Sequence, residues 1–218
     1  MRILALDAAL ARCSAGVVAD ETLRAARQTE ATRGHAALLP TLAQDALAAA
    51  GLTPTDLDII AVTIGPGSFT GIRAALSFAH GLALGAGIPV IGVTVGEALA
   101  DSLPHLGGRQ LWVATDSRRD RIFLEHGANI ESLFLADLPL PDYPIAMAGD
   151  AAIAVAARLA ARDRNVMLTN ARLPMPRHIA MAALARHIGR LVPRAAQPLY
   201  VDPPEAKLPA AGLRPAPQ

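Results

Sequence analysis

The segment from Asp58 to Val95 constrains the fold more than any other part of the chain. It contains a buried strand (Asp58–Ile64), a Gly-Pro-Gly turn, a helix (Phe69 to about Leu84) and a second buried strand (Pro89–Val95). Ser68 is placed to cap the helix, because a serine side chain accepts a hydrogen bond from the first free N–H groups. Strands that alternate with helices in this way predict an α/β fold.

Part of the same segment also has the length of a membrane span, because Ala74–Gly96 contains no Asp, Glu, Lys or Arg. However, glycines and a proline interrupt it, and its second part has the Val/Ile-rich pattern of a strand. The interrupting residues are Gly81, Gly85, Gly87 and Pro89. We therefore expect a buried helix, a turn and a buried strand, and no membrane partner.

Composition excludes several other classes. The chain has 218 residues, of which 52% are hydrophobic, and a net charge of +1, which excludes disorder of the whole chain. The single cysteine, Cys13, excludes a disulfide scaffold and suits a reducing compartment. Asp7 interrupts the apolar start too early for a secretory signal. These features predict a cytoplasmic protein.

Two parts of the chain begin alike. Ile3–Asp7 and Trp112–Asp116 each read as a buried strand that ends in Asp and is followed by a turn and a second strand. The repetition suggests a duplicated α/β fold of the actin and sugar-kinase type, although a strand ending in Asp is common enough for coincidence. Pro104–Gly108 has the composition of a junction. We predict a first subdomain over residues 1–104, a second over 109–202 and a Pro-rich, flexible tail over 203–218.

The Gly65–Arg73 stretch lies where a buried strand meets a helix. Glycines there would let backbone N–H groups approach an anion at the helix N-terminus. A P-loop would require Lys and Ser or Thr after the last glycine, whereas Ile72 and Arg73 follow. No acid for a ribose occurs between Asp58 and Glu97. A phosphate cradle and a tight structural turn both stay open.

Small residues recur every four positions along the helix that follows. They form two rows, Gly71, Ala75, Ala79 and Ser77, Gly81, Gly85. Such rows make a smooth surface on which a second helix can lie close. The partner helix could belong to the domain's own core or to another protein.

No catalytic, cofactor-binding or metal residues are predicted. The six histidines lack metal-site spacing, Ser68 is not in a Gly-x-Ser-x-Gly elbow, and Cys13 has no identifiable helper group. The hairpin turns at Ala8–Cys13 and Ser117–Arg119 lack the glycines with which actin-like ATPases wrap a phosphate. Eight arginines between Arg158 and Arg194 could face RNA or simply solvent.

Nine consecutive residues, Gly65–Arg73, closely resemble the hallmark Gly-Pro-Gly-Ser-Phe-Thr-Gly-Ile/Leu-Arg of the TsaB (YeaZ) family. The turn of this motif consists of Gly65, Pro66, Gly67, Ser68, Thr70 and Gly71. Further segments resemble the family along most of the chain: Ile3–Asp7, Arg33–His35 with Leu38–Pro40, Ile88–Val93, Asp116–Arg119, Leu199–Val201 and Pro203–Lys207.

This resemblance implies an actin-like (ASKHA) duplicated fold with two mixed-sheet subdomains and flanking helices. It implies a non-catalytic scaffold or activating subunit that binds the TsaD threonylcarbamoyltransferase. The complex would form N6-threonylcarbamoyladenosine at adenosine 37 of tRNAs that read ANN codons. The resemblance further implies a TsaE ATPase on the heterodimer, tRNA as substrate of the complex, and a homodimer as one state of the isolated chain.

Carried over by position, the partner surface comprises His35, Leu38, Leu42, Phe69, Ile72, Arg73, Leu76 and His80. The catalytic relative has a His-x-x-x-His metal motif, whereas Leu39 stands four positions after His35. The chain departs from the family pattern at Ala8-Ala9, at Ala36-Ala37 and at Asp202. The alternative function is that of an independent nucleotide-binding hydrolase or peptidase-like enzyme of the actin-like superfamily.

Overall fold

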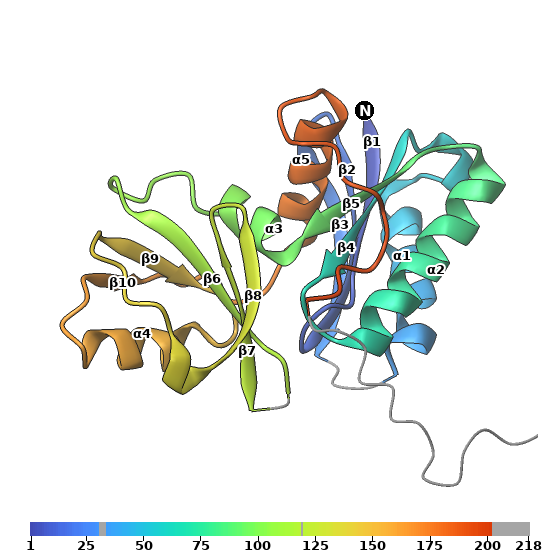
Figure 1. The fold of residues 1–218 in the computed structure, drawn as a ribbon. Coiled ribbons are helices and arrows are strands. Elements are labelled where there is room, and N and C mark those ends of the chain that lie inside the picture. Colours follow the sequence, from blue (N-terminus) through green and yellow to red (C-terminus); the bar gives the residue numbers. More distant parts are fainter. Residues whose placement is uncertain (31–33, 119, 202–218) are drawn as a thin grey trace, which may run out of the picture.

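The computed structural model describes the whole chain except residues 31–33, 119 and 202–218. Two five-stranded mixed sheets lie side by side (Figure 1). The first contains β1 (Arg2–Asp7), β2 (Arg12–Ala19), β3 (Thr22–Glu30), β4 (Ile59–Gly65) and β5 (Val90–Thr94). The second contains β6 (Gln110–Asp116), β7 (Arg121–His126), β8 (Asn129–Phe134), β9 (Ile145–Ala148) and β10 (Val166–Leu168).

The two sheets share one topology. Their strand orders are β3-β2-β1-β4-β5 and, in the same direction, β8-β7-β6-β9-β10. In each order, the first, second and third strands pair antiparallel with their neighbours. The third, fourth and fifth strands pair in parallel. This correspondence confirms the duplicated actin-like α/β fold that the repeated Asp-terminated strands suggest.

In the described part of the chain, five α-helices accompany the sheets: α1 (His35–Ala50), α2 (Phe69–Ala86), α3 (Val95–Asp101), α4 (Ala152–Ala160) and α5 (Pro176–His187). The same residues include two short 3-10 helices, η1 (Pro54–Asp56) and η2 (Leu135–Asp137). The second repeat has no counterpart of α1, since the chain between β8 and β9, which the structure describes in full, contains only η2.

Helices cover both faces of the first sheet (Figure 1). Successive side chains of a strand point to opposite faces. Leu4 and Leu6 of β1 therefore pack toward α1 and α2 in one core cluster. Ile3 and Ala5 pack toward α5, including Ile179, in another. Each fully buried leucine or isoleucine side chain stabilises the fold by about 1.5–3 kcal/mol.

Helix α5 returns from the second sheet to pack against the first. Pro176 at its start sits against Gly16 of β2, where an added Cβ would collide with the proline ring. The helix ends at His187, and Gly189 follows it with a φ of 78°. The subdomain boundaries at 104 and 109 stay a prediction, and the predicted tail lies outside the described residues.

Within the described residues, no helix is both long and apolar enough to cross a membrane. The uncharged Ala74–Gly96 run forms most of α2, all of β5 and the start of α3. Gly87, with a φ of 69°, ends α2 and separates it from β5. The sequence-based prediction of a helix, a turn and a strand is correct here.

Candidate functional site: the exposed face of helix α2

The Gly65–Arg73 turn brings the end of β4 against the β1–β2 turn. Gly67 has a φ of 150°, and a Cβ there would collide with the backbone oxygen of Ala9. The Ser68 N–H donates to that oxygen over 2.7 Å. The Ser68 Oγ accepts from the Gly71 N–H over 3.2 Å and caps α2, as predicted. The geometry favours the tight structural turn over a phosphate cradle, because the chain's own oxygen atoms engage these N–H groups.

The β1–β2 turn is packed with apolar side chains. Ala8, Ala9 and Leu10 are buried in a core cluster that also contains Val113 and Ala148 of the second sheet. The core of the first sheet, which includes this turn, therefore extends to buried side chains of the second sheet.

Asp7, the last residue of β1, forms hydrogen bonds inside this packing. The buried Asp7 carboxylate accepts from the Thr63 hydroxyl over 2.6 Å and from the Ala9 N–H over 3.0 Å. These bonds fix the start of the β1–β2 turn against β4. The neighbouring Cys13 is buried, and burial raises the pKa of its thiol to about 11. Such a thiol is a poor nucleophile at neutral pH, because the thiolate is the reactive form.

The described part of the chain holds no group of three or more His, Cys, Asp or Glu side chains that could bind a metal ion. His35 is the first residue of α1, and its side chain is not described. The Leu39 side chain, four positions later, is buried in the core and 1% exposed.

Helix α2 has two different rows of small residues. Gly71, Ala75 and Ala79 are buried and form the helix's contact with the core. The second row, Ser77, Gly81 and Gly85, is exposed. A Cβ added at Gly81 or Gly85 meets nothing within 4 Å. The first row thus serves internal packing, while the second leaves a smooth strip open on the surface.

An aromatic cluster lies at the N-terminal end of this exposed face. The Phe69 and Tyr200 side chains are 56% and 55% exposed, and their ring centroids are 6.2 Å apart. The Arg73 guanidinium lies 3.8 Å from the Phe69 ring centroid and 5.6 Å from that of Tyr200. Arg73 Nη2 also donates to the Tyr200 hydroxyl over 2.7 Å. Cation–π contact and hydrogen bonding hold the cluster in one arrangement.

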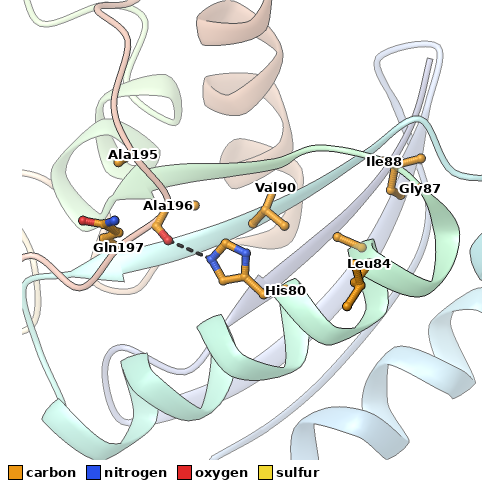
Figure 2. Close-up of a pocket in the computed structure, with 9 residues that line it drawn as sticks. His80, Leu84, Gly87, Ile88, Val90, Ala195, Ala196 and Gln197 are labelled. Atoms are coloured by element: carbon orange, nitrogen blue, oxygen red, sulfur yellow. Dashed lines mark hydrogen bonds between the residues drawn. The ribbon is translucent and has the colours of Figure 1, made fainter.

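Tyr200 belongs to a segment, residues 195–201, that we call the C-terminal strap. Figure 2 shows the hydrogen bond, 2.9 Å long, between His80 Nε2 of α2 and the Ala196 backbone oxygen of the strap. The Leu199 N–H donates to the Ile64 oxygen over 2.9 Å. A Cβ on Gly92 would approach the Ala195 oxygen to 3.0 Å. The strap therefore lies across β4 and β5 and reaches the exposed face of α2.

A groove separates the strap from the C-terminal part of α2. Its volume is about 530 Å³, and it is lined by His80, Ala83, Leu84, Gly87, Ile88, Val90, Ala195, Ala196 and Gln197 (Figure 2). Leu84 is 86% exposed beside it. The face of α2 thus offers an aromatic end, a smooth middle and an apolar groove.

The predicted partner residues fall into two groups. Phe69, Arg73 and His80 are exposed on α2, while on α1 Leu38 is 36% exposed and Leu42 is half-buried. Ile72 and Leu76 are each only 4% exposed and pack in the core.

The predicted set lacks two exposed residues of this face, Tyr200 and Leu84. Leu84 lies four positions after His80 and so could have been found by helical spacing.

The arginines between 158 and 194 do not form one surface set. Arg186 is 8% exposed and donates to the Gly92 oxygen, the Val192 oxygen and the Glu97 carboxylate. It therefore anchors α5 to β5 and α3. Arg158, Arg177 and Arg190 are exposed. Arg186 is thus unavailable for the RNA contact that its sequence position leaves open.

Three comparisons with known proteins agree. The family model "TsaD: tRNA N6-adenosine threonylcarbamoyltransferase" matches residues 24–177. The curated "tRNA threonylcarbamoyladenosine biosynthesis protein TsaB" of Escherichia coli K12 is 36% identical over 124 residues, 56% of this chain and 53% of that protein. A curated "tRNA N6-adenosine threonylcarbamoyltransferase" of Paracoccus denitrificans is 37% identical over 56% of this chain and 41% of its own length. The chain thus spans about half the length of these curated relatives or less.

A solved structure shares the whole architecture. The structure "YeaZ from Pseudomonas aeruginosa" superposes with a TM-score of 0.76 at 26% sequence identity, over 91% of this chain and 99% of that one. The family model covers more than half of the chain, and the structural match extends over both sheets. The chain therefore belongs to the tRNA N6-adenosine threonylcarbamoyltransferase (TsaD) family, in which it is a homologue of TsaB/YeaZ.

Proposed function

We propose that this chain is a scaffold and activating subunit in tRNA threonylcarbamoyladenosine biosynthesis. It docks a TsaD-type threonylcarbamoyltransferase through the exposed face of α2 and the C-terminal strap. The single observation that carries the proposal is the exposed Phe69–Arg73–Tyr200 cluster beside the smooth strip at Gly81 and Gly85.

The chemistry of this face suits a protein partner. Aromatic residues and arginine supply most of the binding energy in protein interfaces, especially when their arrangement is fixed before binding. The strip at Gly81 and Gly85 lets the backbone of a partner helix approach closely, because no side chain projects there. Leu84 and the neighbouring groove supply apolar surface that a partner would bury.

The turn geometry supports a non-catalytic role. Ala8, Ala9 and Leu10 take up the turn that would hold a phosphate, and the Ser68 N–H is bonded to the chain's own Ala9 oxygen. The His-x-x-x-His pair of the catalytic relative is missing, since Leu39 follows His35 at that spacing. In this proposal the partner supplies the catalytic groups.

The finer details of the proposal come from the family resemblance. The acceptor is adenosine 37 of tRNAs that read ANN codons, tRNA is the substrate of the complex, and a TsaE ATPase joins the heterodimer in the cytoplasm. The face of α2 is also the contact through which the isolated chain would form a homodimer.

A transfer assay tests the functional claim. The TsaD homologue of the same organism is incubated with a threonylcarbamoyl donor and tRNA, with and without this chain, and modified adenosine is measured. The proposal predicts product only when both proteins are present. Equal product from the homologue alone would contradict the activating role, and product from this chain alone would favour the independent enzyme.

A further inference from the structure

One buried carboxylate, that of Glu125, connects the two sheets and plays no part in the proposed docking face. Glu125 belongs to β7 of the second sheet and is 9% exposed. Its Oε2 accepts from the hydroxyl of Thr94, at the end of β5, over 2.9 Å. Its Oε1 accepts from the Gly96 N–H of α3 over 2.9 Å. A side chain on Gly96 would collide with this carboxylate, so glycine there lets β7 seat directly on α3.

The contact continues into a chain of charged groups. Thr94 and Glu97 bond each other's backbone N–H groups at the start of α3. The Glu97 Oε1 accepts from Arg186 of α5, and Arg194 Nε lies 3.7 Å from the same oxygen. Movement of Glu125 away from Thr94 would therefore disturb the start of α3, to which α5 is bound.

Among the described residues, the charged groups that act on Glu125 include Glu97 of α3, which is itself paired with Arg186 of α5, and Arg194 of the segment after α5. The cross-strand neighbours of Glu125, Val113 on β6 and Ile130 on β8, carry no charge. Burial raises the pKa of Glu125 to about 7, Glu97 adds to the rise, and the bonds from Thr94 and Gly96 together with Arg194 oppose it.

We propose that Glu125 is a proton-controlled joint between the two sheets. When the carboxyl is uncharged, Oε2 donates to the Thr94 hydroxyl while Oε1 still accepts from the Gly96 N–H, so β7 stays seated on the start of α3. Ionisation places a charge in this buried contact beside Glu97 and loosens it. This role stands independently of the proposed partner and of tRNA modification.

The sign of the pH effect follows from the direction of the shift. The pKa of Glu125 is higher in the closed arrangement, at about 7, than the value of 4.5 for a solvated side chain. The closed arrangement therefore binds more protons, so its added stability is complete at low pH and is lost as pH rises from 4.5 through about 7. A shift of this size changes the equilibrium between closed and open by roughly three hundredfold over the full pH range.

Hydrogen exchange and urea unfolding of the wild-type chain and of E125Q, at about pH 5 to about pH 8, test the joint. The glutamine keeps the shape of the side chain but cannot ionise. We expect the wild type to lose stability relative to E125Q as pH rises, by up to about a hundredfold in the unfolding constant. The Gly96 amide, corrected for its intrinsic rate, should lose protection over the same range in the wild type only.

The exposed Glu21, in the β2–β3 turn, provides the matched control. E21Q should follow the wild-type pH dependence. Parallel pH curves for wild type and E125Q would overturn the proposal. If E125Q fails to fold, the ¹³C carboxyl titration of Glu125 in the wild type decides. A midpoint near 7 supports the joint, and a midpoint near the solvated value of 4.5 refutes it.

Discussion

Arg73 of α2 holds the hydroxyl of Tyr200, a residue 127 positions further along the chain, through bonds of 3.0 Å from Nε and 2.7 Å from Nη2. This contact makes the C-terminal strap part of the same surface as α2. A partner that docks on the helix would therefore also contact the end of the described chain.

The strap should loosen when this contact is removed. Tyr200→Phe deletes the hydroxyl acceptor. The contact between the strap and α2 then loses about 1 kcal/mol of free energy, because the bond is partly solvated. We expect the Leu199 amide, which bonds the Ile64 oxygen, to exchange several-fold faster while global stability changes little. Tyr143→Phe, at a ring that packs edge-on against Trp112, is the control. Unchanged exchange at Leu199 would show that Arg73 does not hold the strap.

The two rows of small residues on α2 should respond in opposite ways to enlargement. Ala75 is 0% exposed, so Ala75→Leu overpacks the core and lowers the free energy of unfolding by about 1–3 kcal/mol. Gly81→Leu projects into open space and should keep or slightly raise stability, because leucine favours helix. Urea unfolding measures both. In the docking proposal Gly81→Leu nevertheless abolishes binding of the TsaD homologue. Normal binding would show that the smooth strip is not part of the docking face.

The buried Arg186 of α5 should contribute to the stability of the fold and not to RNA binding. Arg186→Ala removes the buried guanidinium that donates to the Glu97 carboxylate and to the carbonyl groups of Gly92 and Val192, a loss of about 3 kcal/mol or more. Arg190→Ala, at an exposed position four residues later, should change stability by less than about 0.5 kcal/mol. Chemical denaturation measures the pair. Equal, small effects would contradict the anchoring role of Arg186.

The family motif turn should be intolerant of a single methyl group. Gly67→Ala places a Cβ against the Ala9 oxygen at a φ of 150°, so we expect a loss of about 2 kcal/mol or more. Gly85→Ala, within α2 and facing open space, should gain about 0.5–1 kcal/mol. Thermal unfolding distinguishes them. A Gly67→Ala variant as stable as the wild type would mean that the motif's glycine serves something other than close packing.

Local features could be predicted from the sequence because their causes are local. The Ser68 cap, the turn around Gly67 and the strands that end at Asp7 and Asp116 follow from residue type and spacing alone. The edge strand β8 was not predicted, since its side chains are mostly half-buried and give no clean alternation.

The composition of the proposed docking face could not be predicted fully, because it depends on which side of α2 meets the sheet. Residues carried over by position mixed the exposed Phe69 and Arg73 with the buried Ile72 and Leu76. The burial of Arg186 was equally hidden, since it depends on the return of α5 to the first sheet.

The aromatic cluster on α2 is the part of the surface that we propose binds the partner, and the second sheet supplies a matched control. Arg121 lies 4.9 Å from the ring centroid of Phe134, which is 49% exposed and far from α2 in sequence. Size-exclusion chromatography with light scattering would be run on mixtures of the TsaD homologue with wild type, Phe69→Ala and Phe134→Ala. We predict a one-to-one complex for wild type and Phe134→Ala, and separate proteins for Phe69→Ala. A complex that survives Phe69→Ala, or no complex with folded wild type, would show that the aromatic cluster on α2 does not bind the partner.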